Sequence, residues 1–361
     1  MNVAQIYCSY TLGGAELQMF EITKLLYNKG INVVLCCPFK SKLYFKALNE
    51  KIPVENLNII GSLDFVGIAR LYKIIQQYKI NVVHINQGKL LWPLAILKIL
   101  LKDKIKIVFH RRTTIPLKKM SYWTLKYMDA IFADSTAVKL TLLKAGVSEE
   151  KISVIYPGID LNRFKIDMTT EEMKKKYGLE NNFVVGCIAA MNPPEGKGQK
   201  YLISAIAIIS SIFSDIRLLL VGDGKLRKKL ENFVEKLRVG NYVIFTGFQE
   251  KVEEYISAMD ILCLPSVGEE SFGVVLIEAQ AMGKPVIASN VGGIKEALID
   301  GETGYIIEPR NVVQLVEIIL KLLYDRNLYK KMSLKCYEWV RENFDIIKVV
   351  EKIEQIYNRI F

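Results

Sequence analysis

Short apolar runs alternate with longer amphipathic segments along most of the chain. The apolar runs predict buried strands, while apolar residues recur with helical spacing in segments such as 66–78 and 199–213. Strands that alternate with helices are typical of a parallel sheet covered by helices on both faces. The predicted strands are 3–7, 31–37, 82–86, 105–109, 130–133 and 152–155, followed by 183–189, 218–221, 243–245, 261–264 and 286–288.

The alternation pauses once, which indicates two domains. Residues 160–180 are polar and charged and predict a linker, and the strand–helix alternation resumes at 183. A chain of 361 residues suits two domains of ordinary size, each able to bury a core. We therefore expect an N-terminal domain over residues 1–165 and a C-terminal domain over residues 166–345.

The stretch 265–289 carries the richest candidate chemistry. A polar turn containing Glu270 follows the strand 261–264, and a helix is predicted from about Phe272 to Met282. A helix N-terminus suits phosphate, and Gly273 lets a ligand approach the backbone closely. The carboxylates of Glu270 and Glu278 suit sugar hydroxyls, which donate hydrogen bonds. The stretch therefore predicts a site for a phosphorylated ligand with hydroxyls, although an acidic helix cap with a solvated glutamate is the alternative.

A second glycine-flanked loop precedes the helix that starts near residue 199. Lys197 stands between Gly196 and Gly198, where backbone amides and an ammonium group suit a diphosphate. The loop is not a Walker A motif, because no Ser or Thr follows the lysine. The alternative is a solvated loop lysine.

Two features of the N-terminal half lie at predicted strand ends. Gly13 and Gly14 follow the first strand and either admit a ligand or simply form a tight turn; they are not part of a G-x-G-x-x-G motif. His110 follows the strand 105–109, and ligands of open α/β sheets lie beyond the carboxyl ends of the strands. His110 is therefore a candidate functional residue, with a structural role as the alternative, and His84 is expected to be structural.

Several short motifs follow one another in the C-terminal half of the sequence. They are Glu270-Ser-Phe-Gly273, Glu278-Ala-Gln-Ala-Met-Gly283-Lys-Pro-Val, Gly292-Gly293, Glu296 and Gly301-x-x-Gly304-Tyr. Together they resemble the donor site of family-4 glycosyltransferases of the GT-B fold, with Ser271 where that pattern usually has Gly. The resemblance implies an α/β protein with two Rossmann-like, doubly wound domains facing across a cleft, and a final helix, 346–361, that crosses back to the N-terminal domain.

The same resemblance implies a function and a set of site residues. It implies transfer of a hexose-type sugar, with retention, from a nucleotide-diphosphate donor to a glycan or lipid-linked acceptor in bacterial cell-surface polysaccharide or lipopolysaccharide synthesis. Glu270, His110 and Lys197 are the candidate catalytic residues, and Glu278 is expected to hold the ribose. The other candidates are Gly273, Phe272, Ser271, Val274, Phe248, Gly247 and Gly198 for the donor, and Gly13 and Gly14 for the acceptor or diphosphate.

One part of the family pattern is missing. An Arg usually stands about five residues before the loop lysine, where this chain has Ala190 or Asn192. A catalytically weak relative that binds sugar nucleotides is therefore an alternative, as is an epimerase or phosphorylase of the same fold. The chain has no Asp-x-Asp motif, and we expect no metal and no cofactor beyond the nucleotide-sugar substrate.

The net positive charge of the chain lies in its N-terminal half. Residues 1–160 contain 22 Lys and Arg against 11 Asp and Glu, a net +11, whereas residues 161–361 contain 27 of each. An anionic partner is expected, either a membrane surface or a phosphorylated acceptor. We expect no nucleic acid, because no recognised binding motif is present, and a basic nucleic-acid-binding module is the less favoured alternative. Aromatic and basic residues interleave over 115–128 as in an interfacial helix, although an ordinary amphipathic helix fits equally. No signal peptide is visible, so we expect a cytoplasmic protein, peripheral on the inner membrane face if it binds membranes.

Overall fold

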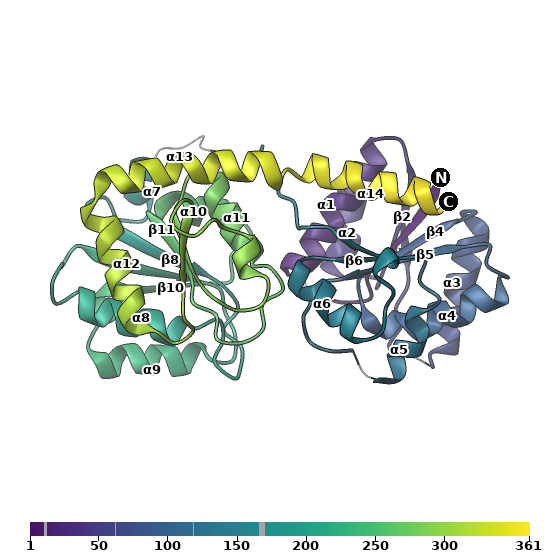
Figure 1. Cartoon of the computed structure of the whole chain (residues 1–361), viewed down its shortest axis with the longest axis horizontal. Coiled ribbons are helices and arrows are strands. Elements are labelled where there is room, and N and C mark those ends of the chain that lie inside the picture. The colour runs from purple at the N-terminus through teal and green to yellow at the C-terminus, as the bar shows by residue number, and fades with distance from the viewer. Residues whose placement is uncertain (11–12, 62, 118, 166–169) are drawn as a thin grey trace. The chain divides into compact units, whose positions relative to one another are not determined.

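The chain forms two compact units in a computed structural model that describes residues 1–10, 13–61, 63–117, 119–165 and 170–361 (Figure 1). The first unit comprises Met1–Gly158 together with Ile346–Phe361, and the second comprises Ile159–Asp345. Thr11 and Leu12, which begin the predicted glycine turn, lie outside the described residues. So do Lys118 of the predicted interfacial helix and residues 166–169 of the predicted linker.

The described part of the first unit contains a seven-stranded parallel sheet. Its strand order is β3-β2-β1-β4-β5-β6-β7. All neighbouring strands pair in parallel, so their carboxyl ends lie on one edge of the sheet. The strands are β1 (Asn2–Ile6), β2 (Asn32–Cys37), β3 (Val54–Asn56), β4 (Val82–Ile85), β5 (Lys106–Arg111), β6 (Ala130–Ala133) and β7 (Ile152–Val154).

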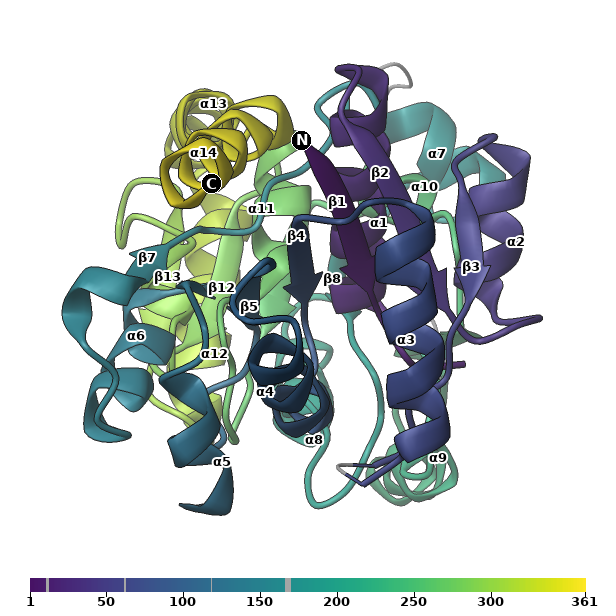
Figure 2. The same ribbon diagram turned by 90° about the vertical axis from the view of Figure 1, so that its right-hand side faces the viewer.

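Helices cover both faces of this sheet, as Figure 2 shows. Alternate strand residues face opposite sides, so one face packs on α3, α4, α5 and α6 and the other on α1, α2 and α14. The last helix of the chain is thus part of the first unit. The bounds are α1 (Gly14–Asn28), α2 (Lys42–Asn49), α3 (Phe65–Gln77), α4 (Leu91–Leu100), α5 (Lys119–Leu125), α6 (Thr136–Lys144) and α14 (Ile346–Ile360), with short 3-10 turns η1 (Gly88–Leu90) and η2 (Glu149–Lys151).

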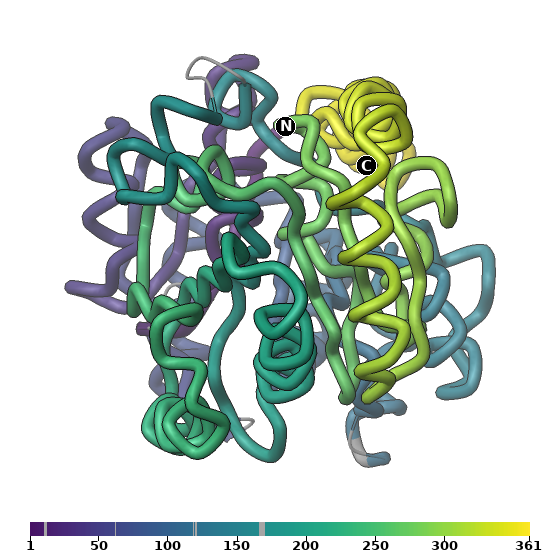
Figure 3. The backbone as a smooth tube through the Cα atoms, turned by 90° about the vertical axis from the view of Figure 1, so that its left-hand side faces the viewer, coloured from purple at the N-terminus to yellow at the C-terminus, as the bar shows by residue number. Residues whose placement is uncertain are grey.

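The second unit repeats this architecture (Figure 3). Its described residues form a six-stranded parallel sheet with the order β10-β9-β8-β11-β12-β13. The strands are β8 (Phe183–Ile188), β9 (Ile216–Val221), β10 (Val243–Gly247), β11 (Ile261–Leu264), β12 (Val286–Ser289) and β13 (Gly304–Ile307). The helices are α7 (Thr170–Lys176), α8 (Gln199–Ile209), α9 (Arg227–Leu237), α10 (Val252–Ala258), α11 (Val274–Ala281), α12 (Val312–Tyr324) and α13 (Arg326–Asn343), with 3-10 turns η3 (Gly240–Tyr242) and η4 (Ile294–Glu296).

Each sheet has a point at which the strand order reverses direction. In the first unit the reversal lies between β1 and β4, and in the second it lies between β8 and β11. Ligands of doubly wound sheets bind beyond the carboxyl ends of the strands at such a point. The predicted doubly wound α/β fold is confirmed, and the loops after these four strands are the places to look for a site.

The division between the units falls at Gly158 and Ile159 rather than between residues 165 and 166. The segment after Gly158 packs on the second unit, where Phe164 is buried and Arg163 forms an ion pair with Glu253 of α10. The expected linker is also shorter than the polar letters suggested, because α7 occupies residues 170–176. Lys174 of α7 is buried, and its Nζ atom lies 2.6 Å from Oδ2 of Asp260. This ion pair holds α7 on the second unit.

Two global properties follow from the helices and strands. No helix among the described residues is both long enough and apolar enough to cross a bilayer. All six cysteines are buried and unbridged.

Candidate functional site

The loops after β8 and β11 meet at the strand reversal of the second sheet. Gly198, at the start of α8, has a φ of +80°, which favours glycine. A Cβ atom there would lie 1.8 Å from the carbonyl oxygen of Pro265, the residue that follows β11. The loop around Lys197 can therefore pass this close to the next loop only because Gly198 has no side chain.

Lys197 and Glu270 are brought together across these two loops. The Nζ atom of Lys197 lies 2.6 Å from Oε2 of Glu270, and the same oxygen accepts a hydrogen bond from Ser266 Oγ at 3.3 Å. The side chain of Lys197 is 33% exposed and that of Glu270 is 15% exposed, so solvent reaches the pair. A partly exposed ion pair contributes little to stability, so each partner can exchange the other for a ligand group at small cost.

The backbone of Glu270 is fixed by the turn after β12. Gly293 donates its N–H to the carbonyl oxygen of Glu270 at 3.0 Å. Gly292 has a φ of +54°, and a Cβ atom there would lie 1.8 Å from the same carbonyl oxygen. The glycine pair noted in the sequence is thus a support for the candidate sugar-binding acid.

The N-terminus of α11 lies directly after Glu270. Gly273 is the N-cap residue, with φ +88° and ψ +61°, a left-handed conformation that favours glycine. Phe272 is fully buried and packs edge to face on Phe344 at a centroid distance of 5.5 Å, which anchors the turn. Ser271 and Val274 on either side are half-buried. The first turn of such a helix presents N–H groups and a positive dipole end to anions.

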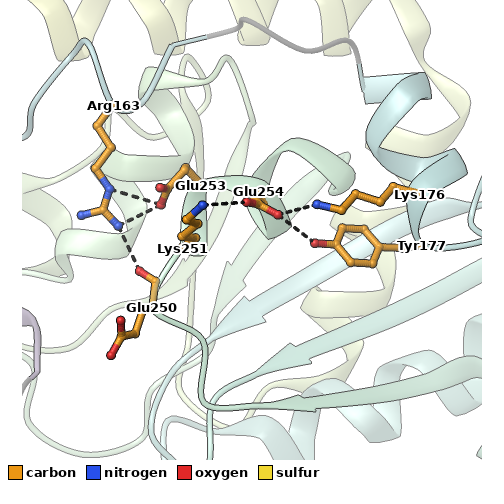
Figure 4. A network of polar contacts seen from close by, with 7 residues as sticks. All are labelled: Arg163, Lys176, Tyr177, Glu250, Lys251, Glu253 and Glu254. Carbon is orange, nitrogen blue, oxygen red and sulfur yellow. Dashed lines mark hydrogen bonds and ion pairs between the residues drawn. The ribbon is translucent and has the colours of Figure 1, made fainter.

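Glu278 lies one turn further along α11 and is half-buried. Burial raises the pKa of its carboxyl group to about 7, an effect that Arg163 opposes and Glu253 reinforces. Arg163 donates hydrogen bonds to Glu253 Oε2 from Nε at 3.2 Å and Nη2 at 2.8 Å, and Nη2 also donates to the carbonyl oxygen of Glu250 (Figure 4). The candidate ribose-binding acid thus titrates near neutral pH.

Gly247 and Phe248 lie at the carboxyl end of β10. Gly247 accepts a hydrogen bond from the N–H of Gly222 at 2.8 Å, and the side chain of Phe248 is 55% exposed. Sequence reasoning missed Arg227 beside them: its Nη1 atom lies 3.1 Å from Asp223 and would lie 3.3 Å from a Cβ on Gly247. The run V-G-D-G before it was the available signal.

The two positions at which an Arg was expected lie on the loop before Lys197. Ala190 accepts a hydrogen bond through its carbonyl oxygen from Gln199 Nε2 at 3.3 Å. The carbonyl oxygen of Asn192 accepts one from the N–H of Gly196 at 2.7 Å. Neither position carries a charge, and Lys197 is the only cationic residue between residues 189 and 199 of the sequence.

The remaining candidates belong to the first unit. Gly13 caps α1 and donates its N–H to Glu16 Oε2 at 3.0 Å, and a Cβ atom on Gly14 would meet nothing within 4 Å. His110 is the fifth residue of β5 and only 1% exposed, so its ring is buried beside the strand end.

Polar contacts fix the state of the His110 ring. Its Nε2 donates to Asp134 Oδ1 at 2.8 Å, and its Nδ1 accepts from Arg112 Nη2 at 3.2 Å. Burial, with Arg112, lowers the pKa of His110 to about 4 although Asp134 opposes the shift. The ring is therefore neutral at pH 7, and the ring of His84 stacks on it at 5.6 Å.

The described residues hold no cluster of three or more His, Cys, Asp or Glu side chains that could bind a metal ion. Within the second unit, the structure brings together Lys197, Gly198, Glu270 and the start of α11, with Glu278 on the following turn. Gly247 and Phe248 lie beyond β9 on the same edge of that sheet. Gly13, Gly14 and His110 belong to the other unit.

The fold and these loops define a class of protein. Two doubly wound units with a lysine, an acid and a helix N-terminus at the strand reversal are the architecture of GT-B glycosyltransferases that use nucleotide-sugar donors. The solved structure of Anabaena HepE in complex with UDP and glucose superposes with a TM-score of 0.88, covers 99% of each chain and is 25% identical.

Sequence comparisons identify the family. The model described as glycosyl transferases group 1 matches residues 169–339, and the model described as glycosyltransferase family 4 matches residues 12–163. Phosphatidyl-myo-inositol mannosyltransferase of Mycobacterium leprae is 33% identical over 100% of this chain and 97% of its own length. N-acetyl-alpha-D-glucosaminyl L-malate synthase of Bacillus anthracis is 28% identical over 98% and 95%. The chain belongs to glycosyltransferase family 4 and is a glycosyltransferase.

Proposed function

We propose that this enzyme transfers a hexose-type sugar from a nucleoside-diphosphate donor to a glycan or lipid-linked acceptor, with retention of the anomeric configuration. The observation that carries the proposal is the pair of Lys197 and Glu270 beside the N-terminus of α11. The complex of HepE with UDP and glucose supports a uridine donor. The relative named for phosphatidyl-myo-inositol supports a lipid-linked acceptor, whereas the name of the other relative, an L-malate synthase, points to a small soluble acid.

Lys197 and the helix N-terminus act on the leaving group. As the bond to the sugar breaks, negative charge develops on the diphosphate. The ammonium group of Lys197, the start of α11 at Gly273 and Val274, and the turn at Gly198 stabilise that charge. When the diphosphate arrives, Lys197 changes partner from Glu270 to phosphate, which releases the carboxylate.

The released carboxylate of Glu270 accepts hydrogen bonds from hydroxyls of the transferring sugar, and Glu278 accepts them from the ribose. Ser271 and Phe272 shape the loop between them. The base lies at Gly247 and Phe248, where an exposed aromatic ring and backbone groups meet it. Binding both ends of the donor positions its anomeric carbon for attack.

The first unit binds the acceptor. We assign the acceptor to Gly13 and Gly14 after β1 and to His110, which is neutral at pH 7, at the end of β5. We propose that the anomeric configuration is retained, and we assign no side chain of the protein as a nucleophile. It is checked by the anomeric configuration of the product, and an inverted product contradicts it.

The leaving-group role assigned to Lys197 and the helix N-terminus needs no metal and no cofactor, in keeping with the absence of an Asp-x-Asp motif. Turnover that collapses in EDTA and returns with Mg²⁺ would contradict metal independence. We also place the enzyme in the cytoplasm, in bacterial cell-surface glycan synthesis, with its basic first unit against the inner face of the membrane.

A second candidate rests on the loop before Lys197. Because Ala190 and Asn192 replace the expected Arg, a protein that binds sugar nucleotides but transfers sugar weakly is the alternative. Incubation with a nucleotide sugar and extracted lipids separates the two. The active transferase makes a glycosylated product at an appreciable rate, whereas the weak relative binds the nucleotide sugar and makes little product. An epimerised donor or a sugar 1-phosphate would identify a different reaction.

The test is turnover by K197M and E270Q. Removing one preorganised stabilising group lowers turnover by about a hundredfold or more. The matched controls are K200M and E269Q, which change exposed neighbours of the same charge and are expected to keep wild-type turnover. Wild-type rates in folded K197M and E270Q would overturn the site assignment.

A further inference from the structure

Five large apolar side chains are exposed on the loops that leave β2 and β3 and on the first turn of α3. Phe39 is 49% exposed, Ile60 78%, Leu63 73%, Phe65 68% and Val66 80%. Single exposed apolar residues are ordinary, whereas a contiguous group marks an interaction surface. We call these five residues the apolar corner.

The apolar corner lies at the carboxyl ends of β2 and β3. These strands are parallel neighbours, and the loops that leave them are tied together. Leu57 donates its N–H to the carbonyl oxygen of Cys37 at 2.9 Å, and Phe39 donates its N–H to Asn56 Oδ1 at 3.0 Å. Figure 2 shows α2 and α3 on either side of β3, the strand at this edge of the sheet. The corner is on the same edge as the proposed acceptor-binding ends of β1 and β5.

The apolar side chains are held outward by a built turn. The carboxylate of Asp64 caps α3, accepting the N–H of Gly67 at 2.9 Å and that of Ile60 at 3.1 Å. Ile59 and Ile68 on either side of the turn are buried in the core. The chain thus buries the apolar residues that fit the core and presents the neighbouring ones to the outside.

The surroundings of the corner are basic. Residues 38–85 contain seven Lys and Arg and three Asp and Glu, a net +4. Each acid is already engaged: Glu50 pairs with Lys24 at 2.8 Å, Glu55 accepts from the Tyr78 hydroxyl at 2.8 Å, and Asp64 caps the helix.

The flanking cations are exposed. They are Lys40, Lys42, Arg70 and Lys73. An apolar group ringed by cations complements a bilayer with anionic headgroups, because the apolar side chains enter the acyl boundary and the cations meet the headgroups. Nucleic acid would satisfy the cations but leave the apolar side chains in water.

We propose that the apolar corner and its flanking cations dock this enzyme on an anionic lipid bilayer. The inference rests on the proposed function, because a docked bilayer supplies an acceptor on the edge of the sheet assigned to it. It names the acceptor as a membrane amphiphile rather than a small soluble acid.

This proposed membrane-binding surface differs from the one that the sequence of residues 115–128 predicted. There α5 spans only Lys119–Leu125, and the ring of Trp123 stacks on Trp92 at 5.4 Å and packs against Tyr127 at 5.0 Å. Its aromatic side chains contact one another and the adjoining helix. Trp123 is 47% exposed, whereas four of the five side chains of the apolar corner are 68% to 80% exposed.

The test is sedimentation with vesicles of phosphatidylcholine alone or with phosphatidylglycerol. The wild type is expected to prefer the anionic vesicles, and L63S/V66S should lower the partition coefficient by about tenfold. The matched control is V313S/L334S, which removes residues 63% and 62% exposed on the second unit and should bind as the wild type does. K40E/K73E should weaken binding and flatten its dependence on salt.

Two outcomes would overturn the docking proposal: equal binding to both kinds of vesicle, or unchanged partitioning of L63S/V66S. In the second case the oligomeric mass of L63S/V66S is also measured, and it either stays the same or changes. A change would mark the corner as a protein interface. Thermal stabilisation by UDP-glucose is measured on every variant. L63S/V66S should keep the wild-type shift, whereas a wild type that is not stabilised by UDP-glucose or other nucleotide sugars would count against the proposed function and not against docking.

Discussion

Glu278 shows how burial sets the chemistry of a single side chain. Its carboxyl group is half-buried and its pKa is raised to about 7. A carboxylate accepts hydrogen bonds from two ribose hydroxyls, whereas the protonated group must donate one of its own. The donor is therefore expected to bind the ionised form more tightly.

The affinity for a nucleotide sugar should consequently fall as the pH drops from 8 to 6. The diphosphate diester of UDP-glucose does not titrate in this range, so the change reports on the protein. The affinity should approach a tenfold loss per pH unit below the pKa of about 7. Calorimetric titration of the wild type and E278Q checks this result. A flat profile in the wild type, or the same slope in E278Q, would contradict the role of Glu278.

The same raised pKa has the opposite effect on the stability of the protein without ligand, which falls as the pH rises. A pKa raised above 4.5 means that folding favours the protonated acid, so its stabilising contribution is complete below 4.5 and is lost as the pH rises through about 7. The wild type without ligand should therefore lose more stability than E278Q between pH 6 and pH 8. Thermal unfolding at the two pH values measures the difference.

At the scale of single elements, glycine turns position the acids. The turn after β12 holds Glu270 only because Gly292 lacks a side chain. Gly292→Ala should reduce turnover by more than about tenfold, since a residue at positive φ is strained and its Cβ displaces the acid. Gly301→Ala is the matched control, with a φ of +78° and nothing within 4 Å of the added Cβ.

Gly301→Ala is expected to destabilise the fold by about 1 kcal/mol through backbone strain, and Gly292→Ala by more, because its Cβ also displaces the carbonyl oxygen of Glu270. Only G292A should also lose turnover while its second unit stays folded by circular dichroism. Equal turnover in the two variants would mean that the turn does not position Glu270.

Apolar runs identified most long elements and missed short or polar ones. Strand β3 has three half-buried residues, and its pairing with β2 depends on a distant segment. Helix α7 looks like a linker because its letters are charged, yet Met173 and Lys174 are buried. The burial of Lys174 depends on Asp260, which is 86 residues away, and local spacing carries no trace of it.

The candidate site was predictable to a similar extent. The order of Glu270, Gly273, Glu278 and Lys197 pointed to a donor site before any fold was known. The pairing of Lys197 with Glu270 and the support of Glu270 by Gly292 arise where separate loops meet. The neutral, buried state of His110 likewise depends on contacts with other parts of the first unit. No single stretch of letters encodes those contacts.

At the scale of the whole chain, the last helix returns to the first unit. Helix α14 packs its apolar stripe on the same sheet face as α1, with Ile353 and Tyr357 fully buried. The hydroxyl of Tyr357 also contacts Gln5 and His84, which ties the end of the chain to β1 and β4. The sequence order of the two units is thus interrupted, and the first unit is complete only when α14 is in place.

Ile353→Ala should therefore destabilise the first unit by about 2–5 kcal/mol, because it leaves a cavity in a packed core. Ile347→Ala on the same helix is the control, since Ile347 is 50% exposed and its loss should cost less than about 1 kcal/mol. Hydrogen exchange should locate the effect of I353A in β1, β4 and α1. Loss of protection in β8 and β11 instead would show that α14 serves the second unit.

The central claim is that Lys197, Glu270 and the start of α11 hold a diphospho-sugar from both ends. A crystal structure with an intact, non-hydrolysable analogue of UDP-glucose tests it most directly. We predict that Lys197 Nζ leaves Glu270 for the diphosphate, that the phosphates lie at the N–H groups of the first turn of α11, and that Glu270 accepts hydrogen bonds from the sugar. An analogue bound elsewhere, or one bound here with Lys197 and Glu270 still 2.6 Å apart, would contradict the account.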